Sequence, residues 1–408
     1  MLNRLAHLLF RLAGGRPEPG IAPLLVTLGL GMTAQYALWT FFAIWAIEEL
    51  GLSGADVGLA FLAAAGAGMA AGVLGGRLSD RIGRRSVILG ASVVQMSLPF
   101  LALSARPAAG IAVLVGLSDA TPVRGTALTA LLADLVPDER REHAFGSMRV
   151  VFNLGAFSGP LLGAALVALA WPALFAGVAV LFGLSFLAAL RLPRLAPPAA
   201  EDGAGISLRI FLDRAFALVF AAGMIAMVVY SSFETLMPVT LTQTHGLEPA
   251  AWGVLFVVNP LFVTLLQLRI TRWSAPLTPA TKLSVAMLLM GTSFLPLLVS
   301  AAIPVLILIL VVFVIGEMLW SPTADALVSR LAPAHARGTY MGTAGISMWL
   351  GGALAPALGL RLRDNWGDDA MWIAIALVSV LGAGLYAAAA SAARPDSNPV
   401  PDTVPEAA

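Results

Sequence analysis

The sequence predicts an all-α membrane protein with twelve spanning helices in two parallel repeats of six. The class follows from composition: 59% of the 408 residues are hydrophobic and 12% are charged, about half the charged share of a soluble domain. Mean hydropathy is +0.89. The repeats follow from five glycine and proline positions that recur 196 residues later; Pro137, Gly146, Gly155, Pro160 and Gly163 reappear as Pro333, Gly342, Gly351, Pro356 and Gly359.

Composition and missing motifs exclude several function classes. The formal net charge is only +1, so a nucleic-acid partner is not expected. Cysteine is absent, which excludes disulfides and thiol chemistry, and the four histidines lack metal-site spacing. No phosphate-cradling Gly-x4-Gly-Lys-Ser/Thr occurs, so ATP does not drive the protein directly and no cofactor is expected. No Ser/His/Asp set converges at one membrane depth, which argues against an enzyme.

Five segments are expected along the chain. Residues 1–20 carry leucines at helical spacing and suit a cytoplasmic amphipathic helix. Two halves of six helices follow, 21–190 and 214–392, separated by the polar linker 191–213. The tail 393–408 is rich in proline and acid, which is typical of disorder. The expected spans, each of membrane-crossing length, are 21–47, 57–75, 86–104, 109–136, 144–169, 171–190, 214–240, 251–271, 281–301, 303–331, 339–362 and 370–392.

The basic residues fix the expected orientation. They gather at one side of the predicted helices, in the N-terminal segment and in alternate loops, while the other side carries only Arg106, Arg361 and Arg363. Because cytoplasmic loops are enriched in Lys and Arg, both termini are expected in the cytoplasm. Almost all of the basic residues are arginine, and alanine is abundant, as expected for a GC-rich bacterial gene. The expected location is therefore a bacterial cytoplasmic membrane.

The stretch from Gly76 to Arg85 is a charged turn expected between the second and third spans. Its pattern Gly-x-x-x-Asp-Arg-x-Gly-Arg-Arg resembles the signature loop of the major facilitator superfamily, which implies twelve-helix secondary transporters. In that family the loop acid caps helix 11 and an arginine pairs with an acid ending helix 4. The resemblance implies that Asp80 faces Gly342 to Gly345 and that Arg84 pairs with Asp134. The resulting conformational latch comprises Gly76, Asp80, Arg81, Gly83, Arg84, Arg85 and Asp134. The alternative is that the arginines of this stretch only determine how the helices are oriented in the membrane.

The predicted fifth helix carries small residues that let helices approach closely, and a proline that can bend it. The run resembles a motif of exporting members, the drug/proton antiporters, and departs from it at Ala164. The alternative is that these residues only allow tight helix packing and do not determine the direction of transport. The motif residues are Gly146, Gly155, Gly159, Pro160 and Gly163.

Ionisable residues inside spans usually face a cavity or a partner. The resemblance places four such acids, candidates for proton coupling, on cavity-lining helices: Glu317, Asp119, Glu234 and Asp325. Glu317 is the first candidate, and a static bridge between Glu317 and Arg124 is the alternative. Antiporters usually carry an arginine where this chain has Leu114, which weakens the case for the usual coupling route. Arg124 is expected to meet an acid on another helix.

Other polar or aromatic side chains are candidates for the substrate cavity, since aromatic rings at mid-membrane suit apolar or cationic ligands. Packing is the alternative for each. They are Gln35, Tyr36, Trp39, Arg124, Arg149, Asn153, Tyr230, Asn259 and Trp320.

These features predict an alternating-access transporter that exports a small drug-like or amphiphilic molecule in exchange for protons. Its partners are then the substrate, protons and the lipid bilayer, and a monomer is expected. A proton-coupled importer of a sugar or organic acid, with Arg124 on a substrate carboxylate, is the first alternative. A membrane sensor or scaffold that does not transport is the alternative from another class.

Overall fold

The computed structural model describes residues 21–104, 106–195, 208–332 and 337–392, and every regular element in these ranges is a helix. The predicted N-terminal helix, the tail and linker residues 196–207 lie outside them. The first half contains α2 (Ala22–Glu48), α3 (Gly54–Ile82), α4 (Arg84–Ala102), α5 (Pro107–Leu135), α6 (Asp138–Val167) and α7 (Trp171–Ala189). The second contains η1 (Leu208–Leu212), α8 (Arg214–Gln243), α9 (Pro249–Phe256), α10 (Val258–Trp273), α11 (Pro279–Thr292), η2 (Leu295–Leu298), α12 (Ile303–Leu331) and α13 (Arg337–Ala392).

Ten helical stretches among the described residues are long and apolar enough to cross a membrane. The helix α5 is not one of the ten, and α13 supplies a single stretch, Thr343–Ala392, although Gly367 breaks its helical backbone at φ 85°. A prediction of twelve spans counts α5 and divides α13 at this kink. The all-helical membrane architecture is therefore confirmed, while the number twelve stays a prediction.

The charged stretch after the second span is helical, and its prediction as a loop was wrong. Helix α3 continues through Gly76 and Asp80 to Ile82, because nothing in the stretch prevents its backbone from continuing the helix. The break falls at Gly83 alone, whose φ of 91° is a conformation that glycine adopts without penalty. The turn into α4 is thus a single residue.

Two predicted helices are each divided, and each break lies four residues before a proline. Proline has no amide hydrogen to donate to the carbonyl four residues earlier, and its ring clashes with that carbonyl. Pro260 stands four residues after Phe256, where α9 ends, and Pro296 stands four residues after Thr292, where α11 ends. The helix expected at 251–271 is therefore observed as two helices, α9 and α10. The helix expected at 281–301 is observed as α11 followed by the short helix η2.

Small residues of the predicted fifth-helix motif bring α6 against α2. A Cβ placed on Gly159 would lie 2.7 Å from the carbonyl oxygen of Thr33, and one on Gly155 would lie 2.5 Å from Cβ of Met32. The second half repeats this contact between α13 and α8, where Gly351 and Gly359 lie directly against α8. The motif glycines therefore serve close helix packing within each half.

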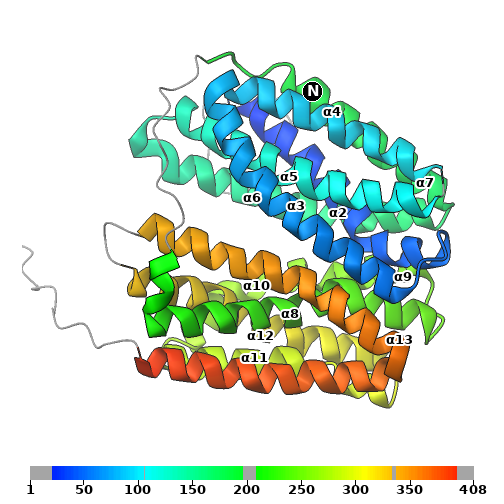
Figure 1. The fold of residues 1–408 in the computed structure, drawn as a ribbon, viewed down its shortest axis with the longest axis vertical. Helices are drawn as coiled ribbons and strands as arrows, with labels where there is room; N and C mark the ends of the chain where they lie inside the picture. The colour runs from blue at the N-terminus through cyan, green and yellow to red at the C-terminus, as the bar shows by residue number, and fades with distance from the viewer. Residues whose placement is uncertain (1–20, 105, 196–207, 333–336, 393–408) are drawn as a thin grey trace, which may run out of the picture.

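The two halves lie side by side (Figure 1), and their contacts include two close glycine–proline approaches. A Cβ on Gly58 of α3 would lie 2.5 Å from the carbonyl oxygen of Pro356 on α13. A Cβ on Gly253 of α9 would lie 2.7 Å from the carbonyl oxygen of Pro160 on α6. Both contacts lie toward the end of the bundle that holds the α2–α3 turn and the kink of α13. We call it the Asp364 end, and the opposite end, with the α3–α4 turn, the Arg84 end.

Candidate functional site

A cavity of about 360 Å³ lies between the halves. Helices α2, α3 and α5 of the first half and α8 and α13 of the second supply its walls. Its lining is mainly aromatic, methionine and small side chains: Trp39, Phe61, Ala65, Ser118, Met227, Ser231, Glu234, Gly345, Met348, Trp349, Gly352 and Ala353. Among the described residues of this lining, Glu234 alone has an ionisable side chain. The cavity therefore suits an apolar or aromatic molecule with one positive charge.

Glu234 sits on α8, where Trp39 of the opposite half and Tyr230, one turn earlier on α8, lie beside its carboxyl group. Trp39 itself packs edge-on against Phe61, with ring centroids 5.3 Å apart. The side chain of Glu234 is partly exposed to the cavity. A carboxylate framed by aromatic rings can bind a cation both by charge and by cation–π contact.

Glu317 on α12 is the second partly exposed acid at this depth. The side-chain amide of Asn259, on α10, donates a hydrogen bond to its Oε2 at 2.5 Å. The charges of Glu317 and Glu234 both act on Tyr36 of α2. Among the described residues, neither carboxylate makes an ion pair with an arginine or lysine. Two acids without a cationic partner leave room for a proton or a cationic ligand.

Arg124 lies away from the cavity, in contrast to the prediction. Its side chain is 2% exposed inside the first half. It donates hydrogen bonds to the amide oxygen of Gln95, to the backbone carbonyl of Thr27 at 2.6 Å and to Ser185 at 2.9 Å. All three acceptors are neutral, so the expected acid partner is not among them, and a bridge from Arg124 to Glu317 does not form.

The guanidinium of Arg124 fits into a notch at Gly31, where any Cβ would overlap it. Its Nε has no hydrogen-bond partner among the described residues. From Gln95 the hydrogen bonds continue to Thr121 at 3.0 Å and from Thr121 to Gln35 at 2.9 Å. A polar chain thus links the buried arginine to Gln35 of α2.

The remaining cavity candidates divide into buried and exposed residues. Trp320 is buried and donates to the hydroxyl of Tyr386 at 2.9 Å, so it serves packing between α12 and α13. Asn153 and Arg149 are exposed on α6. Arg149 acts electrostatically on Asp325 of α12, across the two halves. Asp119 lies on α5 at a position whose side chain is outside the described part of the structure.

The predicted latch residues meet at the Arg84 end. Arg84 contacts Asp80, donates to Ser79 at 2.7 Å and donates to Asp134 at 3.2 Å. Arg85 donates to the carbonyl of Leu190 at 2.8 Å, at the end of α7. Gly83 supplies the turn, Gly76 lies within α3, and Arg81 is exposed. The expected approach of Asp80 to Gly342 and Gly345 stays a prediction.

Contacts at the Asp364 end join the halves and were not predicted from the sequence. The backbone amide of Ala55 donates to Asp364 at 2.9 Å, and Gln243 donates to Glu48 at 3.0 Å. Both bonds cross from one half to the other. Polar residues are common in turns, so nothing in the sequence distinguished these four residues from other polar residues in turns.

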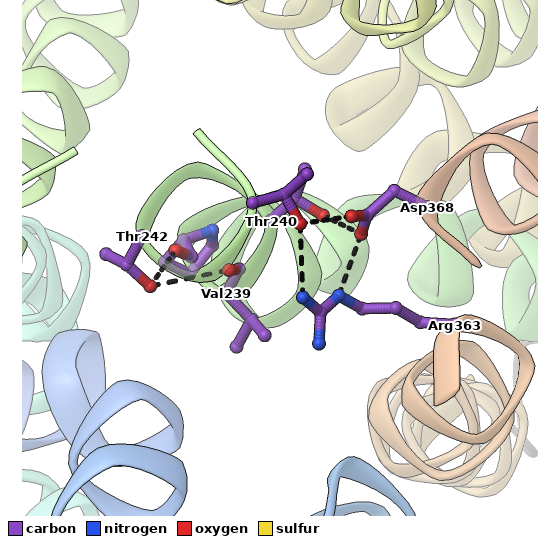
Figure 2. A network of polar contacts seen from close by, with 7 residues as sticks. Val239, Thr240, Thr242, Arg363 and Asp368 are labelled. Carbon is purple, nitrogen blue, oxygen red and sulfur yellow. Dashed lines mark hydrogen bonds and ion pairs between the residues drawn. The ribbon is translucent and has the colours of Figure 1, made fainter. Parts of the chain in front are cut away.

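Beside them, Asp368 organises the turn that follows Gly367, outside the two expected spans. It accepts hydrogen bonds from Arg363 at 2.8 Å and from Thr240 at 2.7 Å (Figure 2), and a third from Thr244. Burial alone would raise the pKa of the Asp368 carboxyl, but the hydrogen bonds from Thr244 and Thr240 and the charge of Arg363 together lower it. The network fixes the end of α8 to the kink of α13.

Within the described ranges, no three His, Cys, Asp or Glu side chains group closely enough to hold a metal ion. The candidate site is therefore built from the two carboxylates and the aromatic walls of the cavity.

Comparisons with known proteins place the chain in one family. Residues 24–356 match the family model described as Major Facilitator Superfamily. The chain is 25% identical over 399 residues to a Na(+), Li(+), K(+)/H(+) antiporter of Planococcus maritimus, covering 87% of this chain and 92% of that one. It is 26% identical over 344 residues to the multidrug resistance protein MdtH of Edwardsiella ictaluri, covering 81% and 82%.

Among solved structures, the fold is similar to that of a bacterial homologue of the human lysosomal transporter Spinster. The TM-score is 0.77 at 14% identity, with 92% of this chain and 98% of that chain covered. The family and the transporter names of its relatives make this protein a membrane transporter and not an enzyme. The chain belongs to the major facilitator superfamily.

Proposed function

We propose that this transporter exports a cationic, amphiphilic organic molecule in exchange for protons. The observation that carries the proposal is the position of Glu234, the one ionisable side chain among the described residues that line a cavity built from aromatic, methionine and small residues. A lone carboxylate in such surroundings favours a ligand that brings one positive charge and apolar surface. The relative named as a multidrug resistance protein agrees with this substrate class.

Coupling follows from competition for the same acids. A proton and a cation each neutralise a carboxylate, and an unpaired carboxylate inside a membrane strongly favours neutralisation by one of them. Protonation of Glu234 or Glu317 therefore displaces the substrate cation, and substrate binding releases the proton. Asn259 holds Glu317 in place through its 2.5 Å hydrogen bond.

Alternating access supplies the movement. We propose that the halves are two six-helix repeats that rock about the cavity in a bacterial cytoplasmic membrane, with both termini in the cytoplasm. Two inter-half hydrogen bonds lie at the Asp364 end, from Ala55 to Asp364 and from Gln243 to Glu48. The Arg84–Asp134 pair lies within the first half and is already formed here. We propose that it acts as a latch when the Arg84 end closes and Asp80 meets α13. A single chain suffices for this cycle.

An exchanger of inorganic cations for protons is the second candidate. Two carboxylates and the amide of Asn259 offer oxygen ligands, and one relative is named a Na(+), Li(+), K(+)/H(+) antiporter. The importer alternative loses its main support, because Arg124 is buried within the first half and cannot reach a substrate carboxylate. A scaffold role does not account for two unpaired acids between the halves.

Everted membrane vesicles with an internal pH dye test the proposal. After the lumen is acidified, the vesicles receive lipophilic cations, neutral drugs, sugars or alkali-metal salts. We expect proton release with lipophilic cations, reduced at least tenfold in Glu234→Gln and in Glu317→Gln. The matched control is Glu49→Gln, since Glu49 is an exposed acid outside the cavity. Release with sodium or potassium alone would favour the second candidate, and release with none of the compounds would contradict both.

A further inference from the structure

We propose that a second pocket, between α10, α11 and α12, binds the phosphate headgroup of an anionic phospholipid. The pocket has a volume of about 610 Å³ and opens at the Arg84 end. Its polar lining consists of Thr271, Ser274, Lys282, Thr323, Ser329 and Arg330. It shares no residue with the central cavity, so the proposal does not depend on what the transporter carries.

The charge of the pocket selects an anion. Lys282 and Arg330 both line it, and none of the described lining residues is an acid. Neither cation makes an ion pair with another described residue. A guanidinium offers paired donors to phosphate oxygens, and the ammonium adds a point charge. The hydroxyls of Thr271, Thr323 and Ser329 can donate to the remaining oxygens, while that of Ser274 donates to the carbonyl of Thr271. A phosphodiester matches this set of donors.

The depth of the pocket places its ligand at the membrane surface. It lies where three apolar stretches reach the same end of the bundle, since Pro249–Gln267 and Ile303–Leu331 end there and Pro279–Leu298 begins there. Trp273, next to the pocket, is 74% exposed, as expected for an aromatic side chain at the lipid–water interface. A headgroup occupies this depth, whereas a free phosphate ion gains nothing from it.

Apolar side chains continue the pocket away from the charges. Leu277, Met318, Leu319 and Pro322 form part of the same lining. They offer a surface for the glycerol and the first methylene groups of a lipid, which a free anion would leave uncovered. Basic pockets between spanning helices are known sites for anionic lipid headgroups. Charge, depth and apolar lining therefore agree on one ligand.

The test is thermal unfolding of the purified full-length chain in neutral detergent during titration with phosphatidylglycerol. Phosphatidylcholine and inorganic phosphate form the comparison arms. One basic residue at a membrane surface strengthens binding about fivefold, so Lys282→Gln/Arg330→Gln is expected to raise the half-saturating lipid concentration about 30-fold. Arg269→Gln is the matched control, because Arg269 is exposed on α10 outside the pocket. This change is expected to leave the half-saturating lipid concentration nearly unchanged.

Three results would overturn the proposal: equal stabilisation by phosphatidylcholine, equal stabilisation by inorganic phosphate, or an unchanged lipid response in the double variant. If that variant does not fold, Ala326→Leu takes its place. Ala326 lines the pocket, so the larger side chain narrows it and leaves both charges. We expect it to weaken the response to phosphatidylglycerol, and an unchanged response would equally overturn the proposal.

Discussion

The carboxylate of Asp364 on α13 accepts a hydrogen bond from the backbone amide of Ala55, in the first turn of α3, across a distance of 2.9 Å. The two residues belong to different halves of the transporter. A carboxylate at a helix N-terminus satisfies a free amide and interacts favourably with the helix dipole. This contact therefore stabilises the arrangement in which the halves are closed at the Asp364 end.

Asp364→Asn is expected to shift the protein toward the state open at this end, about twofold to fivefold, which is the usual range for a charge at a helix terminus. Because the chain has no cysteine, spin labels at Leu169→Cys and Val299→Cys report the distance between the halves. Both sites are exposed at the Asp364 end. The exposed neighbour Asp369 supplies the control Asp369→Asn. Identical distance distributions in the two variants would contradict the assignment.

Gly159→Ala is expected to lower the free energy of unfolding by about 1–3 kcal/mol, the usual cost of overpacking. The added methyl group would lie 2.7 Å from the carbonyl oxygen of Thr33, and α2 cannot yield without losing other contacts. Gly66→Ala is the control, because no atom lies within 4 Å of its Cβ position, and alanine is the better helix former. Thermal unfolding in detergent should rank Gly66→Ala at or above the parent. Equal stability of the two variants would refute close packing of α6 on α2.

Gly31→Ala is expected to displace the Arg124 guanidinium and destabilise the first half, while the same change in an Arg124→Met background should cost much less. Residues in direct contact usually show coupling of about 0.5–3 kcal/mol in such a cycle. Measured unfolding free energies of the parent, both single variants and the double variant give the coupling. Additive effects would mean that the guanidinium does not occupy the notch at Gly31.

Asp368→Asn is expected to destabilise the turn after Gly367 in a pH-dependent way. The pKa of the folded carboxyl lies below its ordinary value of 3.8, so the ionised form is the one that folding favours. Its contribution is complete above the ordinary pKa and disappears as pH falls through the lower, folded value. Melting temperatures of parent and variant should therefore differ at pH 6, and the difference should shrink as pH falls below about 3.8 and vanish only below the folded pKa. A constant difference over this range would exclude the ionised carboxylate as the cause.

The sequence was sufficient for the all-helical membrane architecture because hydropathy acts locally, while the two-repeat layout stays a prediction. The glycines at 155 and 159 indicated close packing, and the structure adds that α2 is their partner. The breaks near Phe256 and Thr292 were also within reach, since each precedes a proline by four residues. The helical course of residues 76–82 was missed because charge was taken as a sign of a loop.

The partner of Arg124 could not be predicted in the same way. Its acceptors Gln95, Thr27 and Ser185 come from three other helices. Their convergence depends on how each helix is rotated about its axis, which apolar sequence patterns in a membrane protein do not specify. The bond from Ala55 to Asp364 joins positions 309 residues apart, so only the docking of the two halves reveals it.

The central claim is that Glu234 and Glu317 exchange a proton for a cationic substrate. Proton release by the purified protein in weakly buffered detergent solution, upon addition of tetraphenylphosphonium, tests it most directly. We expect release from the parent and from Glu49→Gln, and loss of release in Glu234→Gln/Glu317→Gln, with the fold of each variant checked by thermal unfolding. Proton release that persists in a folded double variant would contradict the account.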